Sequence, residues 1–294
     1  MKKAGFLALV LCCGLAVQAQ VKGVKHVILI GMDGLGAYAI EKADNPVMKQ
    51  LMKEGSWTLK ARSVLPSSSA VNWASMIMGA GPELHGFTEW GSKTPEAEPR
   101  ALDEYGLFPS IVTLLRRQQP GIEMGVIYSW EGIGYLFPKK AVNKEQACPN
   151  DTATTDAAVA YIKEKKPGFL FIHFDQPDGV GHGIGHDIPE YYEQVHKNDV
   201  LLGRIVQAVK DAGMWDSSVL ILSSDHGGIN KGHGGKTMVE MQIPWIFTGK
   251  GIKKGHEVQE SVMTYDTAAT IAWIFGLKTP QEWVGRPVKD IFGK

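Results

Sequence analysis

Short apolar runs alternate with amphipathic stretches along most of the chain. Runs rich in β-branched and aromatic residues predict buried strands at residues 26–34, 123–130, 168–175, 217–228 and 243–249. Periodic apolar positions or capping residues predict helices at residues 45–54, 67–81, 110–121, 151–166, 189–213 and 264–277. Apolar strands that alternate with helices are typical of a mostly parallel sheet covered by helices on both faces. We therefore expect an α/β fold, with the polar, proline-rich residues 88–108 as a small loop or cap insert.

The first 19 residues differ from the rest of the chain. A basic start and an apolar stretch are followed by small residues before a cut after Ala19, which predicts a signal peptide. We therefore expect the chain to be exported, to the periplasm or outside the cell. A lipoprotein signal at Cys12 or Cys13 is the alternative, although the residues before each cysteine do not fit a lipobox. Residues 20–294 are long enough for a single catalytic domain, and no later segment is expected to span a membrane.

Composition narrows the chemistry that residues 20–294 can perform. Removal of residues 1–19 takes away two lysines and no acid, which leaves 29 Lys and Arg against 31 Asp and Glu. This balance offers no basic surface for nucleic acid. Cys148 is then the only cysteine, so neither an internal disulfide nor a cysteine-based zinc site can form. Any bound metal must be held by histidines and carboxylates.

Acidic and imidazole side chains follow several of the predicted strands, namely Asp33, then Asp175 with Asp178, then Asp225 with His226; Trp130 follows another. Ligands of parallel sheets bind beyond the carboxyl ends of the strands, which lie along one edge. A lone Asp beside Gly is commonly a turn or a helix cap. The whole set favours a metal site instead, because carboxylate and imidazole suit zinc, and carboxylates also suit manganese or magnesium.

Several short motifs in order resemble those of the alkaline phosphatase superfamily, in its nucleotide pyrophosphatase/phosphodiesterase branch. The matching stretches are "ILIGMDG", "SAVNWASMIMGAGPELHG", "YSWEG", "QPDGVGH", "SSDHGG" and "GHGG", and the tail "TYDTAATIAWIFGL" with "GRPVKDIF" is similar too. The resemblance implies an alkaline phosphatase-like domain that binds two divalent metal ions, with zinc expected first. It implies one site of Asp178, His182 and His233 and another of Asp33, Asp225, His226 and the nucleophile oxygen. His186, in the glycine-rich stretch 178–186, has no counterpart among the family's metal ligands. We interpret it as a loop or supporting residue and not as a ligand.

The register of "GAGPELHG" places Ser69 at the position of the family's nucleophile, where diesterase relatives carry Thr. Asn72 then falls at the position of a phosphate-contacting Asn, while Ser67 and Ser68 remain alternatives as helix caps. A hydroxyl at a helix N-terminus meets unpaired N–H groups, and a metal on the same oxygen would lower its pKa. We therefore expect a phosphorylated Ser69 intermediate, with Asn72 contacting the substrate.

The substrate is expected to be a phosphodiester or a nucleotide pyrophosphate. "YSWEG" resembles a diesterase motif. Trp130, with Trp73 and Trp90 as further candidates, could stack against the leaving group of the substrate; the alternative is that these tryptophans are buried in the hydrophobic core. Lys236 could pair the second charge of a phosphomonoester, which keeps a phosphomonoesterase as the alternative. A sulfatase is disfavoured because Ser69 lacks the Pro and Arg that formylglycine formation needs. A binding protein that lost its chemistry is disfavoured because every matched position is retained.

Overall fold

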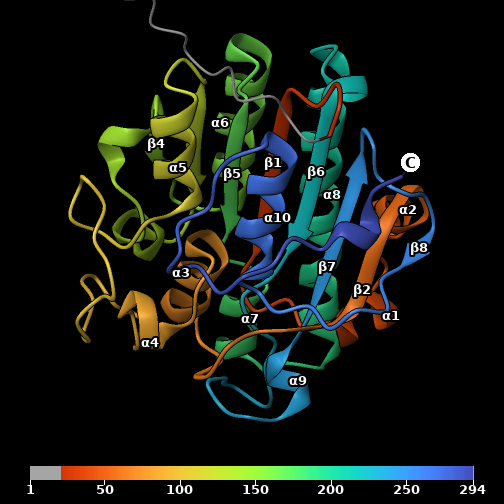
Figure 1. The fold of residues 1–294 in the computed structure, drawn as a ribbon. Coiled ribbons are helices and arrows are strands. Elements are labelled where there is room, and N and C mark those ends of the chain that lie inside the picture. Colours follow the sequence, from red (N-terminus) through yellow and green to blue (C-terminus); the bar gives the residue numbers. More distant parts are fainter. Residues whose placement is uncertain (1–20, 294) are drawn as a thin grey trace, which may run out of the picture.

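The computed structural model describes residues 21–293, so the predicted signal peptide lies outside the described residues. Eight strands form a single sheet in the order β4-β3-β5-β1-β6-β7-β2-β8 (Figure 1). Their bounds are β1 (His26–Met32), β2 (Gly55–Arg62), β3 (Met124–Tyr128), β4 (Lys144–Ala147), β5 (Phe169–Phe174), β6 (Ser218–Ser223), β7 (Gln242–Gly249) and β8 (His256–Glu257). The neighbours from β4 to β6 pair in parallel, whereas β7 is antiparallel to both β6 and β2.

Helices cover both faces of this sheet. The α-helices are α1 (Tyr38–Lys42), α2 (Pro46–Glu54), α3 (Ser69–Met78), α4 (Pro82–His85), α5 (Ile111–Gln118), α6 (Asp151–Lys165), α7 (Asp178–Gly183), α8 (Pro189–Asp211), α9 (Met238–Met241) and α10 (Asp266–Phe275). Among the described residues, no helix has the length and apolar composition needed to cross a bilayer.

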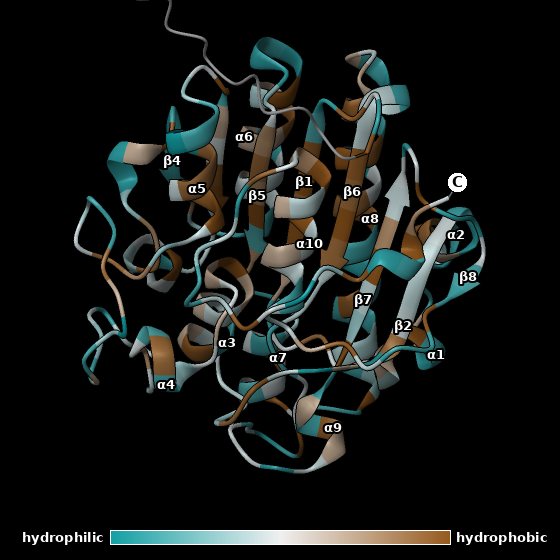
Figure 2. Ribbon diagram, viewed as in Figure 1, coloured by the Kyte–Doolittle hydropathy of each residue, from teal (hydrophilic) through white to brown (hydrophobic). Residues whose placement is uncertain are grey.

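The alternation of side chains along β1 shows why both faces are covered. Val27 and Leu29 pack into one core with α3, α5 and α10, whereas Ile28 and Ile30 pack into a second core with α1, α2, α6 and α8. All four side chains are fully buried, and the strand interiors are correspondingly hydrophobic in Figure 2. A strand that is buried on both sides reads as a continuous apolar run, and that pattern identified it in the sequence. The predicted fold class is confirmed.

Several elements differ from the prediction. The strand β2 was not expected, because its buried and partly exposed positions alternate and its polar residues hide the pattern. Helix α6 is capped by Asn150, whose side chain accepts a hydrogen bond from the Ala153 amide. Ser68 is the N-cap of α3 but makes no side-chain capping bond. Residues 88–108 contain no regular helix or strand, in agreement with the predicted loop.

The glycine-rich stretch 178–186 begins with a short helix, α7, rather than with an open loop. Glycine is needed here wherever a neighbouring side chain approaches the backbone closely. A Cβ on Gly181 would lie 2.3 Å from the ring of His186, and a Cβ on Gly34, in the turn after β1, would lie 2.7 Å from Asp178. The helix places Asp178 and His182 one turn apart, so their side chains meet on one side of it.

Candidate active site

The carboxyl ends of the parallel strands bring the predicted polar residues to one edge of the sheet. Asp33 follows β1, Asp225 follows β6 and Asp175 follows β5, while α7 begins at Asp178, three residues after Asp175. The Asp178 amide donates to the Asp33 carbonyl at 3.0 Å, which fixes the start of α7 against the end of β1. This edge lies in the lower half of Figure 1, where α7 is drawn below the sheet.

Asp33 is the most heavily engaged carboxylate. Its Oδ2 accepts from Trp73 Nε1 at 2.9 Å and lies 3.2 Å from His173 Nε2, while its Oδ1 lies 3.5 Å from His226 Nε2. Burial, with repulsion from Asp225 and Asp178, raises the pKa of Asp33 well above its ordinary value. Trp73 and His173 therefore orient Asp33 so that its second oxygen faces the cluster. Trp73, expected as a stacking candidate, is a buried donor.

Asp225 leaves a buried oxygen without a partner. Its Oδ1 accepts from the Gly34 amide at 3.1 Å, but its Oδ2 makes no hydrogen bond with any described residue and lies 3.2 Å from His226 Nε2. Burial raises the pKa of Asp225 well above its ordinary value. A buried carboxylate oxygen without a donor is strongly unfavourable unless a cation or a proton neutralises it.

The histidines of the cluster present the ring nitrogen that binds metal. Nδ1 of His182 lies 3.0 Å from the Lys231 carbonyl, Nδ1 of His233 lies 3.0 Å from the Ser67 carbonyl, and Nδ1 of His226 lies 2.8 Å from the Gly227 carbonyl. A carbonyl only accepts, so the proton sits on Nδ1 and each Nε2 carries a lone pair. A carbonyl that fixes the outer nitrogen in this way is the usual support of a histidine metal ligand.

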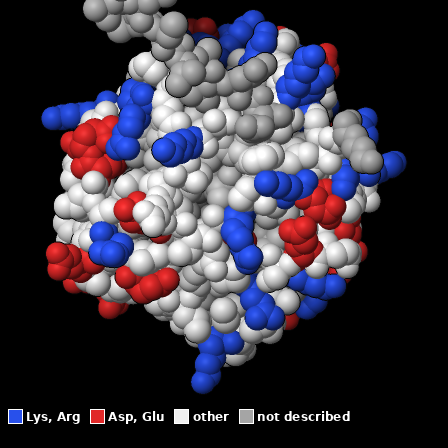
Figure 3. Space-filling view, in the orientation of Figure 1, with Lys and Arg blue, Asp and Glu red and all other residues white. Residues whose placement is uncertain are grey.

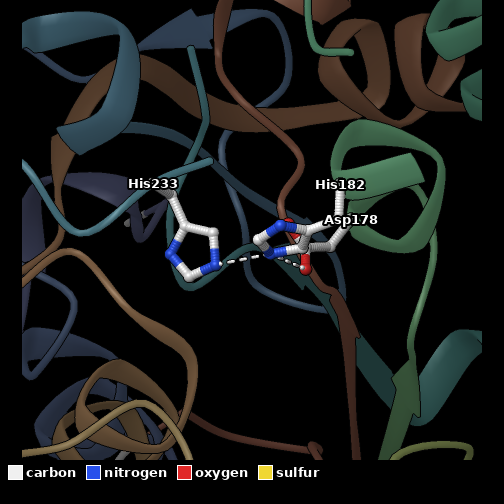
Figure 4. Close-up of side chains that lie close together, drawn as sticks. All are labelled: Asp178, His182 and His233. Carbon is white, nitrogen blue, oxygen red and sulfur yellow. Dashed lines mark hydrogen bonds and ion pairs between the residues drawn. The ribbon is translucent and has the colours of Figure 1, made fainter. Parts of the chain in front are cut away.

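These lone pairs converge on the carboxylates. Nε2 of His182 lies 3.3 Å from Asp178 Oδ2 and 3.0 Å from His233 Nε2 (Figure 4). The rings of His226 and His233 stack with centroids 3.6 Å apart. Two imidazole lone pairs that face each other at 3.0 Å repel unless a proton or a cation lies between them. The residues present therefore fit a divalent cation.

Two ligand groups result, with the donor atoms of each lying within 4.8 Å of one another. They are Asp178, His182 and His233, and Asp33, Asp178 and His226. Asp178 belongs to both groups. Asp225 belongs to neither, but its Oδ2 lies 3.2 Å from Nε2 of His226, a member of the second group. The donor set of imidazole and carboxylate suits zinc, and manganese is compatible with it. Every metal ligand expected from the sequence is thus brought together in one place.

Ser69 is the serine that faces this cluster. Its Oγ lies 3.2 Å from His226 Nε2 and 3.5 Å from Asp33 Oδ1, at the first residue of α3. Ser67 is used elsewhere, because its Oγ donates to the Gly235 carbonyl at 2.7 Å and so holds the loop that carries His233. Of the three consecutive serines, Ser69 is thus the one whose hydroxyl lies within 3.5 Å of the cluster.

Asn72 does not reach the cleft, and its expected contact with substrate needs correction. The side chain is fully buried, its Oδ1 accepts from the Val64 amide at 2.7 Å, and its Nδ2 lies 3.1–3.2 Å from the carbonyls of Val64, Pro66 and Ser68. An amide that is engaged on both sides has no free donor for a phosphate. Asn72 instead fastens the segment that leads into α3, and thereby fixes Ser69.

A cleft of about 210 Å³ opens beside Ser69. Nine residues line it: Asp33, Ser69, Trp90, Trp130, Asp175, Asp178, Gly179, His182 and His233. None of them is Lys or Arg. Lys236, expected as a substrate-binding cation, is exposed on the loop after His233 and does not line the cleft. Burial, with repulsion from Asp33, raises the pKa of Asp175 to about 6.

Sequence reasoning missed the role of His173 and undervalued Trp90. His173 is a polar residue inside the apolar run of β5, which is the signal that could have identified it. Trp90 lies in the irregular segment 88–108, where no periodicity indicates which way a side chain points. His186 is absent from both ligand groups, and its Nε2 lies 3.8 Å from Asp178 Oδ1.

A family model and several known proteins match this chain. The family described as type I phosphodiesterase / nucleotide pyrophosphatase matches residues 27–241. The Homo sapiens ectonucleotide pyrophosphatase/phosphodiesterase family member 1 is 25% identical over 217 residues, which are 68% of this chain and 23% of that protein. The chain thus spans about a quarter of the length of that relative. It aligns with 45% of the human family member 5, also at 25% identity.

Solved structures show the same fold. Murine ectonucleotide pyrophosphatase/phosphodiesterase 5, solved as an inactive variant in complex with AMP, superposes with a TM-score of 0.73 at 16% identity, covering 92% of this chain and all of that chain. A 2-O GAG sulfatase, BT1596, superposes with a TM-score of 0.74 at 15% identity over 90% of this chain and 73% of that chain. At these identities the likeness shows the fold alone. The resemblance expected from the motifs is confirmed by the family match.

Proposed function

Because the chain belongs to the type I phosphodiesterase / nucleotide pyrophosphatase family, we propose that it is a metal-dependent hydrolase of phosphate diesters with Ser69 as nucleophile. The observation that carries this proposal is the position of Ser69 Oγ. It lies at the start of a helix, 3.2 Å from His226 Nε2 and 3.5 Å from Asp33 Oδ1, on the wall of the cleft.

Two different sets of side chains would bind the two metal ions. Asp178, His182 and His233 would hold one divalent ion, and Asp33, Asp225 and His226 would hold the other, with zinc as the expected metal. Bound metal supplies positive charge that lowers the pKa of the attacking hydroxyl and stabilises the negative charge of the transition state. The start of α3 adds the positive end of a helix dipole at Ser69, although the Ala70 amide already donates to the Trp90 carbonyl at 3.0 Å.

The reaction proceeds in two displacements at phosphorus. In the first, a bond forms between Ser69 Oγ and phosphorus while one ester bond breaks and its alcohol or phosphate leaves. In the second, water cleaves the bond between Oγ and phosphorus, which releases a phosphomonoester and regenerates the hydroxyl. Asn72 serves both steps indirectly, because its hydrogen bonds to the backbone of residues 64–68 hold Ser69 in place.

The charges on the cleft wall favour a diester over a monoester. A diester carries one negative charge on the reacting group, whereas a monoester carries up to two. The nine lining residues include no Lys or Arg, and three of them are aspartates. Apart from the proposed metal ions, a second phosphate charge would therefore find no positively charged side chain on the wall of this partly desolvated cleft, which is costly. A phosphomonoesterase remains the second candidate, supported only by Lys236 if that side chain turns inward.

A comparison of three chromogenic esters tests the proposal. Bis(p-nitrophenyl) phosphate, p-nitrophenyl phosphate and p-nitrophenyl sulfate share the same leaving group, so their kcat/KM values can be compared directly. We expect the diester to be the best substrate, the monoester to be slower and the sulfate ester to be turned over poorly. A monoester preference that disappears in Lys236→Ala would support the phosphomonoesterase instead.

A further inference from the structure

Helix α7 carries two of the metal ligands, but it is too short and too rich in glycine to hold its shape alone. It has six residues, Asp178–Gly183, of which three are glycine. Glycine loses more conformational freedom in a helix than any other residue, and isolated helices of fewer than about 12 residues are marginal in water. The one buried residue within 178–183 is Gly181, which has no side chain to pack. The positions of Asp178 and His182 must therefore be imposed by contacts around α7.

The turn between β5 and α7 is held at its backbone by two side chains. The Asp175 amide donates to Asp151 Oδ1 at 2.9 Å, and the Gln176 amide donates to Asp151 Oδ2 at 3.2 Å. The Gln176 carbonyl accepts from Asn198 Nδ2 at 3.0 Å. The side chain of Gln176 extends this hold into the helix, because its Oε1 accepts from the Val180 amide at 3.0 Å. The chain is thus fixed in place immediately before α7 begins.

Asp151 is the centre of this arrangement. Lysines, arginines and acids are interspersed over the surface drawn in Figure 3, whereas Asp151 is only 6% exposed. Besides the two amides of the turn, its oxygens accept from Ser129 Oγ at 2.5 Å and from Asn198 Nδ2 at 3.1 Å. None of these four donors is a cation. Burying a carboxylate is costly unless its oxygens are hydrogen-bonded, so Asp151 and its donors hold one another in place.

Helix α8 connects this turn to the turn that follows Asp33. Asn198 lies seven residues after Tyr191, which is two turns of helix, so both side chains lie on one face of α8. Tyr191 Oη donates to the Gly34 carbonyl at 2.7 Å and accepts from the Gly36 amide at 3.2 Å. One face of α8 therefore holds the turn after β1 and the turn after β5 together. This contact fixes the distance between the strand ends from which the two ligand groups are built.

We propose that Asp151 is a positioning residue of the metal centre, which acts by fixing the turn before α7 and thereby the places of Asp178 and His182. The inference rests on the proposed function and adds to it a residue that touches neither metal nor substrate. Asp151 is absent from both ligand groups and from the lining of the cleft. Because Asp178 belongs to both ligand groups, a displaced α7 weakens both of them.

The affinity of the purified full chain for zinc tests this role without any substrate. Asp151→Asn keeps the shape of the side chain but replaces one acceptor by a donor that faces other donors. We expect this variant to bind zinc on the order of tenfold more weakly than wild type, measured by competition with a chromogenic chelator. Asn150→Ala is the matched control, because it removes the cap of the same helix without touching the turn. It should bind zinc within twofold of wild type, although it melts at a lower temperature.

Hydrolysis at rising zinc concentration separates positioning from a direct part in the chemistry. At low zinc, Asp151→Asn should cleave bis(p-nitrophenyl) phosphate more slowly than wild type. Excess zinc should restore most of kcat, because every metal ligand and Ser69 are still present. A kcat that stays low in a variant shown to hold the wild-type amount of zinc would contradict a role through metal binding.

The inference is wrong if Asp151→Asn binds zinc within twofold of wild type, or if Asn150→Ala loses as much affinity as Asp151→Asn. If Asp151→Asn does not fold, Gln176→Ala decides, because it removes the hydrogen bond to Val180 and leaves the backbone contacts intact. Gln176→Ala should bind zinc severalfold more weakly, and an unchanged affinity would refute the role of the turn. If wild type itself neither binds zinc nor cleaves the diester, the proposed function fails and this inference fails with it. An active, zinc-binding wild type beside an unaffected Asp151→Asn refutes the positioning role alone.

Discussion

Asp178 Oδ1 lies 3.8 Å from His186 Nε2, and neither atom makes a hydrogen bond with any described residue. His186 is buried, and its imidazole is enclosed between Gly181 and Gly228, where any Cβ would lie 2.3 Å from the ring. The ring is thus held behind the one carboxylate that both ligand groups share. The separation is longer than a hydrogen bond, and we predict that a small shift of the ring lets Nε2–H donate to Oδ1, which would orient the carboxylate and raise metal affinity.

His186→Leu should therefore weaken binding of zinc to the site by roughly 10- to 100-fold, the usual effect of losing a supporting group. His186→Gln should retain most of the affinity, because its amide can donate at a similar reach. Competition with a chromogenic chelator measures both affinities without any substrate. Equal affinities for wild type and His186→Leu would show that His186 only fills space.

Asn72→Ala should lower the free energy of unfolding by about 2–4 kcal/mol, because the buried Val64 amide and several carbonyls lose their partner. The folded fraction should still bind metal, and its loss of turnover should follow the loss of order at Ser69. Denaturant unfolding of the metal-free protein gives the free energy directly. If Asn72→Ala has normal stability but no activity, the result would instead support the direct contact between Asn72 and substrate that the sequence predicted.

His85 makes the fold sensitive to acid. Its Nδ1 accepts from the Phe87 amide at 3.1 Å, so Nε2 carries the proton and donates to Ser75 Oγ at 2.9 Å. Burial lowers the pKa of His85 from 6.5 to about 3. Between these values the unfolded chain binds a proton that the folded chain excludes. This contribution to stability is therefore complete above pH 6.5 and is lost as the pH falls toward 3.

Replacing His85 by Asn should make the stability less dependent on pH. Wild type should lose about 2 kcal/mol between pH 7.5 and pH 5 from this group alone, and His85→Asn should lose correspondingly less although it is less stable at pH 7.5. His196→Asn is the control, because it removes a histidine from the surface. If both variants show the same pH slope as wild type, His85 is not the acid-sensitive group.

Removal of metal should abolish hydrolysis and lower the melting temperature, because ions that bind only the folded chain stabilise it by mass action. Without ions, Asp33, Asp178 and Asp225 face one another in a buried cluster. Asp225→Asn should keep the shape of the side chain but reduce the metal content measured by elemental analysis. Undiminished activity in protein shown to contain no metal would contradict the assignment of the cluster.

The parallel strands and the metal ligands could be predicted because both are local in the sequence. A strand buried on both faces reads as one apolar run, and its ligand follows within a few residues, as in β6 with Asp225 and His226. The shorter or partly exposed strands β2, β4 and β8 carry no such run and were missed. Their pairing depends on partners far away along the chain, which a window of residues does not contain.

The supporting residues of the site were harder to predict for the same reason. His173 and Trp73 orient Asp33 across separations of 140 and 40 residues, and only the packed fold brings them together. The sequence register located Asn72 correctly beside Ser69 but could not show that its amide turns toward the backbone. Trp90 lies in an irregular loop, where no period indicates the direction of a side chain. The chemical role of a motif can therefore be predicted from the sequence, whereas the residues that surround the motif in the fold cannot.

The central claim is that Ser69 is the nucleophile of a phosphodiesterase. The most direct measurement is kcat/KM for bis(p-nitrophenyl) phosphate on metal-loaded wild type, Ser69→Ala and Ser67→Ala, with the metal content of each determined. Ser69→Ala should keep most of its metal and lose at least about a thousandfold in kcat/KM, as deletions of a nucleophile do. Ser67→Ala, at equal metal content, should lose far less. A Ser69→Ala variant that hydrolyses the diester within tenfold of wild type would contradict the account.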